Sequence, residues 1–127
     1  MKPITVLLRY KGTGDAARRF AEEMESSGTA ALIRAEEGNL RYEYFFPMND
    51  PESVLLVDSW RDQTAIDAHH ASPMMAKILE LREKYGLTVT AERYVGDEMP
   101  ERDAEFVSNE MREEYDFSES VEPPFLQ

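Results

Sequence analysis

The sequence predicts an α+β fold in which two helical segments cover one face of a four-stranded antiparallel sheet. Three observations support this prediction. Four short segments alternate apolar and polar residues, which is typical of half-buried strands. Two longer segments carry apolar residues three or four positions apart, as amphipathic helices do. The chain has 127 residues, the usual length of one domain.

The first strand is expected over residues 4–10, where every second residue is apolar. The turn sequence KGTGD follows, and Asp15 is a candidate N-cap for the first helical segment. This segment covers residues 16–35 and contains Gly28. Because glycine costs a helix about 1 kcal/mol relative to alanine, we expect a kink or a break at this residue.

A β-hairpin is expected after the first helical segment. Gly38 is placed to end that segment. Residues 40–46 then alternate as a second strand, and residues 54–60 form a third. The connecting sequence PMNDPES is rich in turn-forming residues. The third strand is the more continuously apolar of the two, so it is predicted to lie inside the sheet.

The second helical segment is predicted in two parts. A short helix begins at Gln63 or Thr64. The helix restarts at Ser72 and Pro73, because serine is a good N-cap and proline suits the first helical position. Gly86 is placed to end this second part.

Residues 87–95 alternate again and complete the sheet as a fourth strand. The resulting order β-α-β-β-α-β is that of the ferredoxin-like fold, with both helical segments on one face of the sheet. The other face would expose an apolar patch larger than the few hundred Å² usual for a monomer. We therefore expect a second copy, the C-terminal segment, or both to cover it.

The charge of the chain is unevenly distributed. The net charge of −12 argues against nucleic-acid binding, which needs clustered lysines and arginines. Residues 97–127 hold eleven acidic and two basic residues, which predicts a domain over residues 1–96 and an acidic C-terminal tail over residues 97–127. Apolar residues recur at helical spacing in the tail, which favours a docked arm over a solvated extension: Ala104, Val107, Met111 and Tyr115.

Several features predict where this protein works. No apolar run reaches the roughly 18–20 residues of a membrane span, and the N-terminus lacks the features of a signal peptide. The chain has no cysteine, so disulfides and thiolate metal sites are excluded. We expect a cytoplasmic protein without membrane or nucleic-acid partners.

Two segments, RAEEGNLRYEYF and VLLVDSWRDQTAIDAHHASP, resemble the antibiotic biosynthesis monooxygenase (ABM) family. The resemblance spans roughly residues 2–95. The shared features are an acid–glycine turn at Glu37–Gly38, an aromatic strand with Tyr42, and an aromatic end to the third strand at Trp60. An Ala-His pair at Ala68–His69 and a Ser-Pro step at Ser72–Pro73 follow. The resemblance implies a ferredoxin-like domain that dimerises through its sheets into a dimeric α/β barrel. It also implies a pocket between the sheet and the helices.

The resemblance implies several kinds of activity. Family members include cofactor-independent oxygenases of quinols and polyketide aromatics, haem-degrading enzymes and isomerases. Haem-degrading members have an asparagine on the first strand and a histidine late in the second helix, and this sequence has neither. In many quinol-oxygenase-like members a second histidine follows the Ser-Pro step, where this chain has Met74. A histidine site would therefore depend on His69 alone.

His69 is the candidate catalytic residue. A histidine side chain has an ordinary pKa of about 6.5, so it can accept a proton near neutral pH. His69 would act as a base or as a hydrogen-bond donor, unless it is a helix-end histidine bonded to a main-chain carbonyl. Its neighbour His70 points about 100° away on a helix, so the pair cannot easily bind one metal ion. We expect neither a metal nor another cofactor.

Four residues are candidates for substrate binding. Trp60, Tyr42 and Phe46 would line an apolar pocket, although each could equally belong to the core. Asp58 would orient a histidine or bond a main-chain group. The strand residues Arg9, Arg41 and Arg93 could hold an anionic substrate if they face a pocket. Surface or dimer salt bridges are the favoured interpretation for these arginines.

The sequence thus predicts a cofactor-independent monooxygenase that oxidises a small aromatic or quinol-type substrate with O2. Two alternatives stay open. The protein could be a non-catalytic dimeric module that binds small molecules in a stress response, or an isomerase of a small oxygenated metabolite, which would need no O2.

Overall fold

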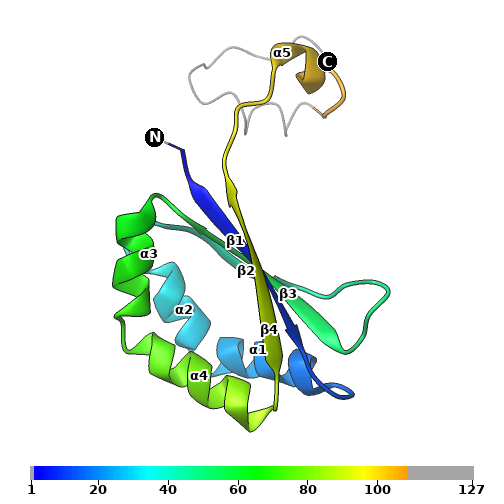
Figure 1. The fold of residues 1–127 in the computed structure, drawn as a ribbon, viewed down its shortest axis with the longest axis vertical. Helices are drawn as coiled ribbons and strands as arrows, with labels where there is room; N and C mark the ends of the chain where they lie inside the picture. The colour runs from blue at the N-terminus through cyan, green and yellow to red at the C-terminus, as the bar shows by residue number, and fades with distance from the viewer. Residues whose placement is uncertain (1, 109–127) are drawn as a thin grey trace. The chain divides into compact units, whose positions relative to one another are not determined.

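The computed structural model describes residues 2–108 of the chain. The chain divides into two compact units, Met1–Gly96 and Asp97–Gln127. The first unit contains a four-stranded antiparallel sheet in the order β2-β3-β1-β4. The strands are β1 (Ile4–Lys11), β2 (Asn39–Phe45), β3 (Ser53–Trp60) and β4 (Thr88–Val95) (Figure 1). This arrangement confirms the predicted ferredoxin-like fold, with β3 inside the sheet.

The first helical segment is broken into two helices, as predicted. Helix α1 covers Ala16–Ser26 and helix α2 covers Thr29–Arg34. Between them Gly28 has φ of +82°, a left-handed conformation that glycine adopts without steric cost. Asp15 stands at the N-cap position of α1, but its side chain makes no cap hydrogen bond.

The second helical segment consists of α3 (Gln63–His70) and α4 (Met74–Lys84). The side chain of Asp62 caps α3 by accepting a hydrogen bond from the main-chain N–H of Ala65 at 2.9 Å. The predicted serine cap of α4 is wrong. Pro73 occupies the N-cap position, and Oγ of Ser72 is buried without a hydrogen-bond partner in the part of the chain that the structure describes. The main-chain carbonyl of Ser72, rather than its hydroxyl, accepts the N–H of Met75.

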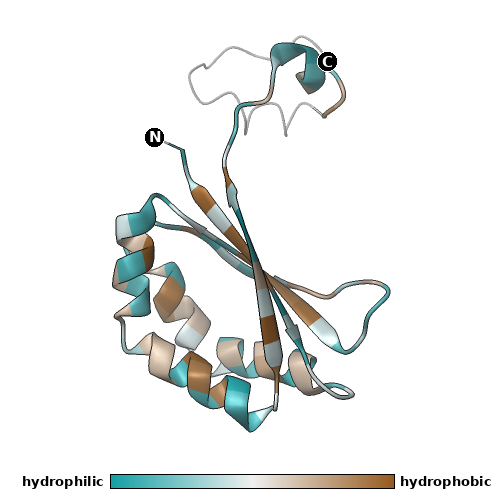
Figure 2. Cartoon of the chain, viewed as in Figure 1, coloured by the Kyte–Doolittle hydropathy of each residue, from teal (hydrophilic) through white to brown (hydrophobic). Residues whose placement is uncertain are grey.

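The core lies between the sheet and the helices. Brown apolar bands alternate with paler ones along the strands in Figure 2, as the period of two requires. Phe20 of α1 is fully buried and packs its ring against Tyr10 of β1 and Tyr44 of β2, with centroid distances of 4.7 and 6.2 Å. Helix α1 thus covers these aromatic side chains and buries the middle of the sheet face that the helices cover.

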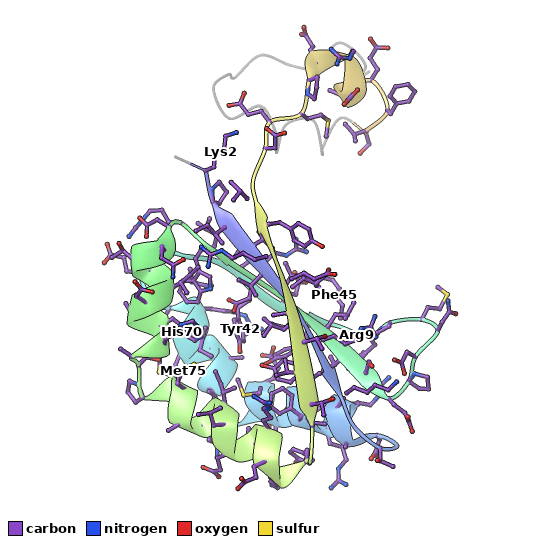
Figure 3. The ribbon with its side chains drawn as sticks, in the orientation of Figure 1. Lys2, Arg9, Tyr42, Phe45, His70 and Met75 are labelled. Atoms are coloured by element: carbon purple, nitrogen blue, oxygen red, sulfur yellow. The ribbon has the colours of Figure 1, made fainter. Side chains whose placement is uncertain are left out.

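The opposite face of the sheet carries no helix within residues 2–96. At its centre lie Leu7, Leu55 and Val57, all half-buried. Figure 3 shows Phe45 and Arg9 beyond the sheet, on the side away from His70 and Met75 of the helical layer. This face is thus apolar at its centre, as the alternating pattern predicted, and it also carries charged side chains such as Arg9.

The tail is described only in part. Helix α5 covers Glu101–Ala104, residues 105–106 form a turn, and residues 107–108 are irregular. Val107 lies beyond the end of this helix, and the docked arm remains a prediction. Met111 and Tyr115, the other residues of that prediction, lie outside the described residues.

Candidate functional site

His69 lies in the last turn of α3 and is only 4% exposed. Its Nδ1 atom is 2.7 Å from Oε1 of Glu36, which lies in the connection between α2 and β2. A carboxylate oxygen only accepts hydrogen bonds, so Nδ1 carries the proton in this pair. The contact is thus a charge-assisted bond to a carboxylate and not a bond to a main-chain carbonyl.

The pairing with Glu36 leaves Nε2 of His69 as the free ring nitrogen. No described residue forms a hydrogen bond with Nε2. Within residues 2–108, Nε2 is therefore the ring nitrogen that is left to accept a proton. An imidazole held at Nδ1 with an open Nε2 lone pair is the arrangement that a general base needs.

Trp60 ends β3 and forms the wall against which His69 rests. The Trp60 and His69 rings are stacked, with centroids 4.8 Å apart and an interplanar angle of 28°. Trp60 is 1% exposed, and its indole Nε1 donates a buried hydrogen bond of 2.6 Å to Oδ1 of Asp58. The indole therefore joins the carboxyl group of Asp58 to the imidazole through two short contacts.

Asp58 is a buried carboxyl group on the helix side of β3. Burial raises its pKa to about 7, the hydrogen bond from Trp60 opposes the increase, and the negative charge of Glu36 adds to it. Asp58 therefore bonds the indole, and it neither orients His69 nor bonds a main-chain group as the sequence suggested. A carboxyl group that changes protonation near neutral pH is characteristic of functional sites.

Tyr42 of β2 completes the cluster on the sheet side. Its ring lies edge-on to His69 with a centroid distance of 6.5 Å, and its hydroxyl is 3.3 Å from that of Tyr44. Figure 3 shows Tyr42 between the helical layer and the sheet. Burial, the largest effect, raises the pKa of both hydroxyls, so neither phenol ionises near neutral pH.

The structure does not bring Phe46 into this cluster. Phe46 follows the end of β2 and lies under the guanidinium of Arg18, 3.9 Å from the ring centroid. It lines a separate open hollow of about 540 Å³ between α1, α2 and β2, to which Tyr44 and Arg34 also contribute. The sequence-predicted residues His69, Trp60, Tyr42 and Asp58 are thus the four that come together.

Glu36 is the member of the site that the sequence analysis missed. The sequence Glu36–Glu37–Gly38 contains two adjacent acids before a glycine, and the pattern does not tell which one faces inward. In the structure Glu37 is exposed and approaches Arg61 at 3.8 Å, whereas Glu36 turns toward His69. Gly38 has φ of +86°, and this left-handed turn separates the helical connection from β2.

His70 takes no part in the cluster. It is exposed, and its ring is tilted 42° from that of His69 with centroids 5.7 Å apart. Within residues 2–108, no three histidine, aspartate or glutamate side chains gather closely enough to hold a metal ion. No helix in that range combines the length and apolarity that crossing a membrane needs.

An uncovered strip of the sheet lies on the same face as the cluster. We define it as the helix-side residues of β1 and β4: Ile4, Val6, Leu8, Ala91 and Arg93. The residues on β1 are only half-buried although β1 is an inner strand, and the residues on β4 are exposed. The reason is that α3 packs mainly on β3 and α4, while α4 packs mainly on α1 and α2.

The three strand arginines fall on different faces. Arg9 and Arg41 lie on the face without helices, where Arg9 contacts Asp50 at 3.3 Å and Arg41 contacts Glu43 at 3.0 Å. These two form surface ion pairs, which was the favoured interpretation. Arg93 instead lies on the helix side of β4 and donates a hydrogen bond to Oε1 of Gln63 in α3.

The model of the antibiotic biosynthesis monooxygenase family matches residues 3–81. The chain belongs to the ABM family. The match includes Glu36, Asp58, Trp60 and His69, whereas β4 with Arg93 lies outside it. No curated protein matches the chain.

Three solved structures illustrate how the ABM fold recurs. SnoaB, a cofactor-independent oxygenase from Streptomyces nogalater, is 18% identical over 79% of this chain and 96% of that chain, with a TM-score of 0.60. PA3566 from Pseudomonas aeruginosa is 21% identical over 76% and 96%, with a TM-score of 0.63. A conserved protein of unknown function from Bacteroides thetaiotaomicron is 14% identical over 75% and 98%, with a TM-score of 0.66. At these identities the likeness shows the fold alone.

Proposed function

We propose that this ABM protein is a cofactor-independent monooxygenase that oxidises a small aromatic or quinol-type substrate with O2 in the cytoplasm. The observation that supports this function best is the hydrogen bond between His69 Nδ1 and Glu36, which leaves Nε2 as the ring nitrogen without a partner among residues 2–108. Its membership of the ABM family and its fold likeness to SnoaB agree with this chemistry. Asp58, Trp60 and Tyr42 surround the imidazole and complete the proposed site.

The substrate is proposed to lie on the apolar part of the uncovered strip. Ile4, Val6 and Leu8 offer an apolar floor next to the cluster on the same face of the sheet. An aromatic ring gains free energy by covering such surface, at roughly 25 cal/mol per Å² removed from water. Ile4 pairs with Trp60 in the register, and Trp60 stacks on His69, so the proposal turns the substrate hydroxyl toward this imidazole.

The first chemical step is a proton transfer. His69 Nε2 takes the proton of the substrate hydroxyl and becomes part of an imidazolium. The carboxylate of Glu36 stabilises this positive charge through the bond at Nδ1. The substrate is left as an electron-rich anion, which passes one electron to O2 far more readily than its neutral form does.

The overall reaction balances with O2 as the only oxidant. One oxygen atom enters the substrate carbon and the other leaves as water, so a hydroquinone ring C–H becomes C–OH while the two ring hydroxyls become quinone carbonyls. The four electrons that reduce O2 to these products come from the substrate. The proton held on His69 leaves with the water, which returns the imidazole to its starting state.

Incubation with a panel of hydroquinones under O2 labelled with heavy oxygen tests this proposal. We expect a product that carries one labelled oxygen atom, formed only when O2 is present. His69→Ala should lower turnover at least 100-fold, since general base catalysis contributes typically 10²–10⁴-fold. His70→Ala removes an exposed neighbouring imidazole and is the matched control, with turnover expected unchanged.

Three outcomes would contradict the monooxygenase proposal. Product formed equally without O2 would favour the isomerase alternative. Binding of the hydroquinones without any product would favour the binding module. Binding can be followed by the fluorescence of Trp60, because it is the single tryptophan of the chain. Unchanged turnover of His69→Ala would remove the histidine from the mechanism.

We also propose that two copies pair through the faces of their sheets that carry no helix. Leu7, Leu55 and Val57 form an apolar centre that stays half-exposed in the single chain. Burying this centre against a second copy removes it from water, and the charged rim with Arg9 and Arg41 can pair across the interface. Light scattering at micromolar concentration should give the mass of a dimer.

A further inference from the structure

Arg93 is the charged residue of the uncovered strip. The strand registers pair Val6 with both Asp58 and Arg93, and Asp58 with Tyr42. Tyr42, Asp58, Val6 and Arg93 therefore form one row across the helix side of the sheet. Neighbouring strands lie about 4.8 Å apart, and β1 lies between β3 and β4, so the main chains at Asp58 and Arg93 are roughly 10 Å apart. In this row, Val6 is the residue that lies between Asp58 and Arg93.

The guanidinium of Arg93 is held by a neutral partner. One Nη2–H donates to Oε1 of Gln63 at 2.5 Å. The amide nitrogen of Gln63 in turn donates to Oδ1 of Asp67 at 2.8 Å, which fixes the direction of the amide oxygen. Among residues 2–108, no carboxylate lies within ion-pair distance of Arg93. Within this described range, its hydrogen bond is therefore to a neutral amide and not to a carboxylate.

The side chain of Arg93 also has unused hydrogen-bond donors. A guanidinium offers five N–H donors in a planar fork that matches the two oxygens of a carboxylate. Gln63 takes one of them. No other residue among 2–108 accepts from the remaining donors, which a ligand could therefore engage. Arg93 is exposed at the edge strand, while Val6 beside it is half-buried and apolar. A charged edge next to an apolar floor is complementary to an aromatic ring that carries an anionic oxygen.

We propose that Arg93 forms an anion-binding subsite, and that the protein selects aromatic substrates that carry a carboxylate or another anionic oxygen. The ring lies over Val6, its anionic group contacts the guanidinium of Arg93, and its opposite side faces the cluster of Asp58 and His69. This subsite rests on the proposed function in one respect, because it places the ligand on the same strip. The subsite also specifies the substrate class, and Arg93 lies outside residues 3–81, the region that matches the family.

Calorimetric titration of the full chain with dihydroxybenzoate and with its neutral isostere dihydroxybenzamide tests the subsite. We expect the carboxylate to bind about tenfold more tightly than the amide at low salt, and less so at high salt, where exposed charges are screened. Arg93→Gln should abolish this preference, and Arg93→Lys should retain part of it. Arg19→Gln is the matched control, because Arg19 is an exposed arginine of α1, away from the strip and from the proposed dimer interface.

Three results would overturn the subsite: equal binding of the two compounds to the native chain, binding of neither, or a preference that survives Arg93→Gln. Circular dichroism of each variant shows whether its fold is intact. The test is independent of catalysis. Tight, Arg93-dependent binding without turnover would overturn the monooxygenase proposal and support the subsite. Turnover of neutral hydroquinones alone would support the monooxygenase proposal and overturn the subsite.

Discussion

Nδ1 of His69 lies 2.7 Å from Oε1 of Glu36, and this contact joins the end of α3 to the turn before β2. The two residues are 33 positions apart in the sequence, and only the packing of α3 beside the turn brings them together. The carboxylate holds the proton of the imidazole on Nδ1 and leaves Nε2 as the acceptor. Several predictions of function and stability depend on this pair and on its neighbours.

Glu36→Gln should lower turnover of the proposed substrate by at least tenfold while substrate affinity changes little. The amide keeps the shape of the carboxylate but no longer stabilises the imidazolium, and its NH2 group can donate to Nδ1 and favour the other tautomer. Nitrogen NMR of the His69 ring measures the tautomer directly. Glu37→Gln is the control, since Glu37 is 89% exposed and faces Arg61, so a loss of equal size in both variants would contradict the assignment.

Asp58→Asn should change how stability depends on pH. Because burial raises the pKa of Asp58 to about 7, the folded state holds a proton between about pH 4 and pH 7 that the unfolded chain releases. This group therefore lowers the free energy of unfolding as pH rises through that window, by up to roughly 4 kcal/mol. Asparagine still accepts the hydrogen bond from Trp60 and has no such penalty.

Urea unfolding at pH 5 and at pH 8 measures this effect. The stability of Asp58→Asn relative to the native chain should rise between the two pH values. Asp15→Asn replaces an exposed carboxylate and serves as the control. A difference between Asp58→Asn and the native chain that is the same at both pH values would contradict the raised pKa.

Gly38→Ala should destabilise the protein by about 3 kcal/mol. Gly38 has φ of +86°, which costs an L-residue about 1–2 kcal/mol. Its new Cβ would also stand 2.5 Å from Cβ of Ala65 in α3, which forces α3 away from the turn. The control Gly14→Ala has a similar φ of +61° but meets no atom within 4 Å, so it should cost only the conformational part. Equal losses in thermal unfolding would show that the contact with Ala65 is unimportant.

Val57→Arg should convert the proposed dimer into a monomer. Val57 lies at the apolar centre of the face without helices, so a guanidinium there would be buried against its copy without a partner. Leu32→Arg, on the exposed side of α2, is the control and should stay dimeric. Light scattering at several concentrations measures the mass. A Val57→Arg variant that remains dimeric would place the interface elsewhere.

The order of the elements could be predicted from the sequence because local patterns determine it. The period of two in residues 4–10 and 54–60 reports which side chains share a face, and Gly28 breaks the first helical segment as its low helix propensity requires. The start of α4 could not be predicted in this way. Ser72 suits an N-cap, but the chain enters α4 in a direction that buries its hydroxyl and leaves the cap position to Pro73.

The candidate site could be predicted only in part. His69, Trp60, Tyr42 and Asp58 come together as the alternation and the family resemblance suggested. Phe46 shares their strand pattern but lies beyond the end of β2, under Arg18, because β2 ends one residue earlier. Arg93 is exposed, as the favoured interpretation expected, but only the register of β4 shows that it lies on the helix side of the sheet.

By itself the sequence determined the fold class, because hydrophobic periodicity, glycine positions and turn residues act over a few neighbours along the chain. It also determined which residue types were available for chemistry: one tryptophan, two histidines and no cysteine. Only the tertiary structure decided that Glu36 rather than Glu37 meets His69, that the indole of Trp60 bonds Asp58, and that Arg93 stands beside Val6. Those contacts join residues far apart in the chain, and only the packing of helices on a registered sheet determines them.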